Sequence, residues 1–228
     1  NCTGDKVLTG NSCGGKYEKC IEPLQYLYSD RTLSAEIIPG KSVIGIAVDP
    51  ENRLAVAIDY IMTTGWGGYG IDILTLENTP SSGAGIYVRG ERDSYLIRDG
   101  KANTAKILAY GRSNGISYPA AEAAYNYQPG SCSLSSWCGR GNWYLPSNWQ
   151  VFPYFDNRAT IHLMLKAINK MPNDWWYTRN DFYTVTSNEI NAKESGFIYI
   201  NTGGMAHGGK NLTEPDNLQT LVLPYITY

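Results

Sequence analysis

Apolar and β-branched residues cluster between turn-forming residues in the first half of the chain, a pattern that predicts strands. Residues 42–49 (SVIGIAVD) and 53–59 (RLAVAID) are apolar runs, and the turn-forming sequence DPEN lies between them. Two such runs around a short polar turn predict a β-hairpin. Residues 63–85 contain six glycines, and we expect them to form a long surface connection.

Helical patterns follow in the middle of the chain. We expect a first helix over about 100–110 and a second over 117–127, with Ser117 as its N-cap and Pro119 in its first turn. After a glycine- and cysteine-rich loop at 129–141, Ser147 is positioned to cap a short helix that Pro153 should end. Residues 157–170 carry the apolar spacing of an amphipathic helix.

Short strands are expected in the last quarter, at 175–178, 182–186, 196–200 and 220–226. No linker divides residues 35–228, so this part is expected to be one domain, of the α+β class. Residues 1–34 are rich in Gly, Cys and Lys and are interpreted as a disulfide-pinned leader or stalk end. The first residues contain neither a start methionine nor a signal peptide, which indicates a mature or excised fragment.

The composition favours a recognition domain outside the cell. The chain has 18 Tyr and 6 Trp, whose amphipathic side chains suit exposed recognition surfaces, although loop-rich extracellular domains also use them structurally. The net charge is −2 and no Lys/Arg run exists, which argues against a nucleic-acid partner. No apolar stretch approaches the roughly 20 residues of a membrane-spanning helix, so we expect no membrane insertion.

Five cysteines fall into two local groups, at 2, 13 and 20 and at 132 and 138. Neither group has the C-x-x-C spacing of zinc sites, and only two histidines could supplement them. Short-range disulfides therefore fit better: Cys132 with Cys138, and one bridge within the first twenty residues. One cysteine remains for another segment or chain. Disulfides indicate a secreted or cell-surface location.

The segment Gly141-Asn-Trp-Tyr-Leu-Pro146 resembles the W-x-L-P signature in the C-terminal domains of bacterial collagen-like adhesins. Similar features follow in the family's order over residues 99–228: DGKANT (99–104), YPAAEAA (118–124), DWWYT (174–178), GFIYI (196–200) and LVLPYI (221–226). The resemblance implies a C-type-lectin-like fold, shared with formylglycine-generating enzymes, with short antiparallel sheets, two to four helices and long loops. Leu223 replaces the family's terminal Arg, and TRND (178–181) replaces its Ser-Thr-Glu triplet.

The W-x-L-P segment itself is interpreted as structural. Trp143 and Leu145 alternate with Tyr144 in a short strand, and Pro146 with Ser147 stops the strand and starts a helix. Residues placed in this way set a corner of the core, so we do not expect them to bind a ligand.

Catalytic motifs are lacking, and we expect a non-catalytic protein without a cofactor or metal. His162 lies among apolar residues of a predicted helix, and His207 lies in GGMAHGG (203–209), which we expect to be a mobile loop. No nucleophile elbow, zinc-protease motif or phosphate-binding loop is present. The formylglycine-generating relatives use late cysteines, whereas this chain has none after Cys138. The sequence TEPDN (213–217) offers calcium-type oxygen ligands, but a turn accounts for it better.

Polar and aromatic residues concentrate in 172–217, and we place ligand recognition there. Aromatic faces stack on sugars or peptide side chains, and amide, carboxylate and guanidinium groups orient them. Trp175 and Tyr177 share one face of a strand while Trp176 takes the other, so these three cannot all contact a ligand. The predicted ligand-binding residues are Trp175, Tyr177, Arg179, Asn180, Asp181, Tyr183, Asn201, His207, Lys210 and Asn211.

Three functions fit these observations. The first is an adhesin-like domain that binds a glycan or a cell-surface protein without catalysis. The second is a retroelement-diversified binding protein of C-type-lectin-like fold. The third is a structural or trimerisation module of a surface filament, for which a homo-oligomer is the expected state.

Overall fold

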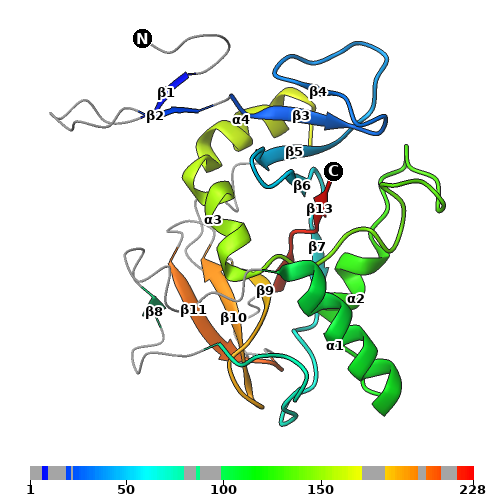
Figure 1. The fold of residues 1–228 in the computed structure, drawn as a ribbon, viewed down its shortest axis with the longest axis vertical. Coiled ribbons are helices and arrows are strands. Elements are labelled where there is room, and N and C mark those ends of the chain that lie inside the picture. Colours follow the sequence, from blue (N-terminus) through cyan, green and yellow to red (C-terminus); the bar gives the residue numbers. More distant parts are fainter. Residues whose placement is uncertain are drawn as a thin grey trace, which may run out of the picture.

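The structure is a computed structural model that describes residues 23–79, 99–170, 183–199, 204–211 and 221–228. It also describes the backbone of the short strands at 7–9, 19–21 and 86–87 and of Thr220. Within these ranges the chain is α+β, as the sequence predicts, with four α-helices and three sheets. In Figure 1, the strands β3–β6 lie towards one end of the molecule and β9–β11 towards the other, with α3 between them.

The first large sheet has five strands in the order β13-β6-β5-β3-β4. The predicted hairpin is confirmed, because β5 (Val43–Asp49) pairs antiparallel with β6 (Leu54–Ala57). Its other members are β3 (Gln25–Tyr28), β4 (Leu33–Ser34) and β13 (Tyr225–Thr227). Residues 25–34, which were predicted to belong to the leader, contribute β3 and β4 to this sheet: β3 pairs with β4 and β5, and Leu27 and Tyr28 are completely buried.

The second large sheet has six strands in the order β7-β12-β9-β10-β11-β8. They are β7 (Ile61–Thr63), β12 (Thr220–Val222), β9 (Tyr183–Glu189), β10 (Glu194–Tyr199), β11 (Met205–Gly209) and β8 (Ile86–Tyr87). All pairs are antiparallel except β12 with β9. A separate pair joins β1 (Val7–Thr9) to β2 (Lys19–Ile21).

Three of the late strands predicted from the sequence are present, with changes. β9 and β10 correspond to the expected strands at 182–186 and 196–200. The expected strand at 220–226 divides at Leu223 and Pro224, so that β12 enters the six-stranded sheet and β13 the five-stranded sheet. The predicted strand at 175–178 lies outside the described residues. The loop expected at 203–209 is instead largely strand β11.

The four helices lie close to their predicted positions: α1 (Gly100–Asn114), α2 (Pro119–Asn126), α3 (Asn148–Asp156) and α4 (Arg158–Ala167). α1 packs against β9, α2 packs against β7 and β12, and α3 contacts both large sheets through β5, β9 and β10. No helix in the described ranges is long and apolar enough to cross a membrane.

Two details of the helix termini differ from expectation. Pro153 does not end α3 but lies inside it. A capping box between Ser147 and Gln150 and the burial of Val151, Phe152, Tyr154 and Phe155 compensate for the backbone donor that proline lacks. Ser117 does not cap α2; the Glu122 carboxylate instead accepts bonds from the Tyr118 backbone N–H and the Ser117 hydroxyl.

The W-x-L-P segment lies where three clusters of buried side chains meet. Trp143, Tyr144 and Leu145 are each at most 2% exposed, and each belongs to a different cluster. Tyr144 forms a bridge with Tyr225 through two backbone hydrogen bonds of 2.9 Å. Every side chain of this tripeptide is buried, so the prediction that the segment forms a core corner is confirmed.

The predicted disulfide between Cys132 and Cys138 is present and packs in the same cluster as Trp143. Its Sγ–Sγ distance is 2.06 Å. The indole N–H of Trp143 donates to the Cys138 carbonyl oxygen at 2.8 Å. Cys2, Cys13 and Cys20 lie outside the residues whose side chains are described.

Candidate functional site

The predicted ligand-binding residues separate into three groups in the structure. Trp175, Tyr177, Arg179, Asn180, Asp181 and Asn201 lie outside the described residues. Asn211 is exposed and His207 is partly exposed. Tyr183 and Lys210 are buried, so the expectation that these two side chains face a ligand on the surface requires correction. Tyr183 packs on Phe197 with ring centroids 4.6 Å apart, and Lys210 forms an internal ion pair.

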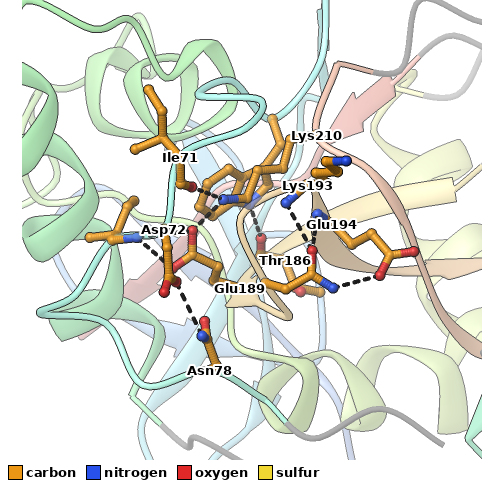
Figure 2. A network of polar contacts seen from close by, with 11 residues as sticks. Ile71, Asp72, Asn78, Thr186, Glu189, Lys193, Glu194 and Lys210 are labelled. Carbon is orange, nitrogen blue, oxygen red and sulfur yellow. Dashed lines mark hydrogen bonds and ion pairs between the residues drawn. The ribbon is translucent and has the colours of Figure 1, made fainter.

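The most concentrated polar chemistry of the described chain surrounds this ion pair between Lys210 and Glu189 (Figure 2). Both side chains are completely buried. Lys210 Nζ also donates to the carbonyl oxygen of Ile71 at 2.7 Å. It lies over the ring of Trp66, 4.9 Å from the ring centroid.

The Glu189 carboxylate is held by the backbone of the connection that follows β7. The Ile73 N–H donates to both carboxylate oxygens, at 3.1 Å and 3.4 Å. Burial raises the pKa of Glu189 and lowers the pKa of Lys210, while each partner favours the charged form of the other. Asp72, bonded to Asn78 at 3.1 Å, adds a nearby negative charge that raises the Glu189 pKa further.

Residues 66–79 are anchored to β9 and β11 through this network. The carbonyl of Lys210 accepts from the N–H groups of Trp66 and Gly67 at 3.0 Å each, and the Thr79 N–H donates to the Glu189 carbonyl at 2.7 Å. The Trp66 indole donates to the Thr186 carbonyl at 2.8 Å. Trp66, Ile73, Leu76 and Thr79 are all buried, so the expected surface connection is in part an interior element.

A second polar layer surrounds β9. The Asn188 side chain accepts from the Asn148 N–H at 2.8 Å and donates to the Thr79 hydroxyl at 2.9 Å. The Thr186 hydroxyl donates to the Asn148 side-chain oxygen at 2.6 Å. These groups satisfy one another inside the protein, as buried polar side chains must. β9 therefore joins the start of α3 to the 66–79 connection.

Towards the surface, the network continues into the turn between β9 and β10. The Asn191 side chain accepts from the N–H groups of Lys193 and Glu194 and donates to the Glu194 carboxylate at 2.7 Å. His207 Nδ1 lies 3.2 Å from the other Glu194 oxygen. Of the predicted residues here, the exposed Asn211 lies within reach of solvent, whereas both ring nitrogens of His207 are buried. Glu194, which was not among the predicted residues, is partly exposed beside His207.

An open recess of about 480 Å³ lies elsewhere, beside the C-terminal half of α1, α2 and the connection between these helices. Two exposed arginines, Arg112 and Arg140, line it together with the Glu122 carboxylate and the half-exposed ring of Tyr125. Guanidinium and aromatic groups at one recess can orient a polar ligand. The sequence reasoning missed this recess because its lining comes from two helices and the disulfide loop.

The pairing of Glu189 with Lys210 was not predicted from the sequence either. The sequence of β9, YTVTSNE, carried one signal, because polar residues stand on both faces of the strand. In the structure this strand lies between two others of the sheet. A strand with polar residues on both faces in an interior position requires internal partners.

No protein-family model matches the chain, and no curated protein does either. Among solved structures, the fold is similar to that of a fimbrial protein from Bacteroides ovatus ATCC 8483, with a TM-score of 0.55 and 16% sequence identity. The similarity covers 90% of this chain and 48% of the solved chain, so this chain spans about half of that protein's length. At this identity the similarity shows the fold alone: an α+β arrangement also present in a solved fimbrial protein.

Proposed function

We propose that the chain is a non-catalytic module of a surface filament, of the adhesin-like class that recognises a glycan or a cell-surface protein. The observation that carries the proposal is the similarity to a fimbrial protein over 90% of this chain. A secreted or surface location agrees with the disulfide between Cys132 and Cys138, because such bonds persist in oxidising compartments.

The distribution of polar chemistry supports a binding role. Glu189 and Lys210 pair with each other inside the protein and stabilise the fold, so they do not face a ligand. The polar groups near solvent lie instead at the β9–β10 turn, at Asn211 and around the α1–α2 recess. The W-x-L-P resemblance supports a C-type-lectin-like scaffold within this proposal, and the buried corner at Trp143–Leu145 is the feature that such a scaffold would need.

The recognition proposal is tested by presenting the purified chain to an immobilised panel of glycans and extracellular-matrix proteins. We expect saturable binding to at least one class, and loss of binding in Trp175→Ala with Arg179→Ala, or in Arg112→Ala with Arg140→Ala. Lys106→Ala is the matched control, because it removes an exposed charge from α1 outside the recess. Absence of saturable binding across the panel, with a folded protein, would contradict recognition.

A role in assembly is the second candidate, and one observation favours it. Among the strands that the structure describes, β7 lies at one end of the six-stranded sheet, and its Met62 side chain is 38% exposed. A strand at the end of a sheet with an apolar side chain near solvent is a surface on which another chain can add a strand. Light scattering on the purified chain distinguishes the two: a stable homo-oligomer without ligand binding favours assembly, and a monomer that binds ligand favours recognition.

A further inference from the structure

Two long side chains meet across a strand that has no bulky side chain between them. Ser195 of β10 pairs with Glu189 of β9 on one side and with Gly208 of β11 on the other. Directly opposed residues point to the same face of a sheet, and alternate residues of a strand share a face. Glu189 and Lys210, two residues past Gly208, therefore reach over Ser195 towards each other, and Figure 2 shows their side-chain ends in contact.

The contact between Glu189 and Lys210 is shielded from solvent. Neither side chain has any exposed surface, and the indole of Trp66 covers the Lys210 nitrogen. Burial shifts the pKa of Glu189 upwards and the pKa of Lys210 downwards, and both shifts favour a neutral carboxylic acid beside a free amine. A free amine is a nucleophile, whereas an ammonium group is not.

The backbone orients both groups for reaction. The Ile71 carbonyl accepts a hydrogen from Lys210 Nζ at 2.7 Å, which fixes the direction of the amine. The Ile73 N–H donates to the Glu189 carboxyl group and can stabilise negative charge that develops on its oxygen. Two groups held in this way react with effective concentrations of about 10⁵–10⁸ M.

We propose that Lys210 and Glu189 are a modification site at which an intramolecular amide bond forms between Lys210 Nζ and Glu189 Cδ. The amine lone pair attacks the carboxyl carbon, and the new C–N bond replaces the bond from this carbon to its hydroxyl oxygen. The hydroxyl leaves with one of the amine hydrogens as a water molecule. The step is a condensation without oxidation or reduction, so it needs no second substrate.

The amide would connect the ends of β9 and β11 across β10. The carbonyl of Ile71 and the N–H of Ile73, which bond to Lys210 and Glu189, would lie beside it. It closes the chain between residues 189 and 210, a separation of 21 residues. This inference stands apart from the recognition and assembly proposals, because it concerns only the interior of the fold.

The first test is the mass of the intact full-length chain, measured after denaturation, reduction and alkylation so that disulfides do not contribute. We expect a mass lower by one water molecule than the mass calculated for the sequence with all five cysteines alkylated. Lys210→Arg and Glu189→Ala should each restore the full mass of their own sequence. Lys170→Ala is the control, because Lys170 forms a surface ion pair with Asp59 and its removal should leave the deficit in place.

The second test locates the bond. Trypsin cleaves after Arg179, Lys193 and unmodified Lys210, and no Lys or Arg follows Lys210. An amide at Lys210 blocks that cleavage, so we expect a branched product in which residues 180–193 are joined to residues 194–228. The wild-type chain alone decides the question, even if a variant fails to fold. A full-mass wild-type protein, a free 194–210 peptide as the main product, or a water loss mapped elsewhere would overturn the inference.

Discussion

Replacement of Trp143 by alanine tests whether the W-x-L-P segment is a core corner. The Trp143 side chain is 1% exposed, packs edge-on against Tyr127 with centroids 4.8 Å apart, and donates to the Cys138 carbonyl. Truncation of a buried Trp costs about 3–5 kcal/mol of unfolding free energy, and the unpaired carbonyl adds about 1 kcal/mol. We therefore expect Trp143→Ala to lose about 5 kcal/mol, which is a large fraction of the roughly 5–15 kcal/mol by which ordinary domains are stable.

The assay is urea denaturation followed by far-UV circular dichroism, with two comparison variants. Trp143→Phe keeps most of the ring and loses only the N–H donor, so it should cost about 1–2 kcal/mol. Leu163→Ala removes a side chain that is 67% exposed and should change stability by less than about 0.5 kcal/mol. A Trp143→Ala protein with nearly native stability but without ligand binding would refute the core interpretation and make Trp143 a surface binding residue.

Three further predictions concern the backbone, the disulfide and the tyrosines. Gly67→Ala should destabilise the protein by about 2–3 kcal/mol more than Gly70→Ala. Both glycines have positive φ, but of the two only Gly67 lies where a Cβ would come within 2.6–2.8 Å of the Ser117–Pro119 segment. Thermal melts of the two variants would measure this difference in stability. Reduction of Cys132–Cys138, which closes a separation of six residues, should lower the unfolding free energy by about 2 kcal/mol, and equal urea midpoints with and without reductant would contradict this. Burial raises the pKa of Tyr144 from 10.0 to about 12, so its contribution to the unfolding free energy is complete below pH 10 and declines as the pH rises towards 12. Urea titrations between pH 9 and 12 should therefore show that the unfolding free energy falls by up to about 1.4 kcal/mol per pH unit. This fall should be smaller in Tyr144→Phe.

The elements with a regular apolar pattern could be predicted from the sequence. The 43–57 hairpin, α1, α2, α4 and the disulfide follow from local spacing and local chemistry, and they lie where expected. The start of α3 at Ser147 was also predictable, since a capping box is a local signal. Its continuation through Pro153 was not, because burial against both sheets outweighs the missing hydrogen bond only in the folded protein.

The candidate site was harder to predict because the role of each side chain depends on which other side chains it contacts in the folded protein. Lys210 and Tyr183 have the side chains of a binding surface, yet their neighbours in space make them interior residues. The glycines of residues 65–70 resemble those of an exposed loop, whereas Trp66 between them is 1% exposed. Only the pairing of β9 with β10 and of β10 with β11 brings Glu189 within reach of Lys210, and residue types alone do not fix that topology.

The central claim, that this chain is a module of a surface filament, is tested most directly by immunogold electron microscopy of intact cells that produce it. Antibodies raised against the purified chain should label filaments that extend from the cell surface, and a strain without the gene should show no label. Labelling confined to the cell interior of sectioned cells, with bare filaments outside, would contradict the proposal.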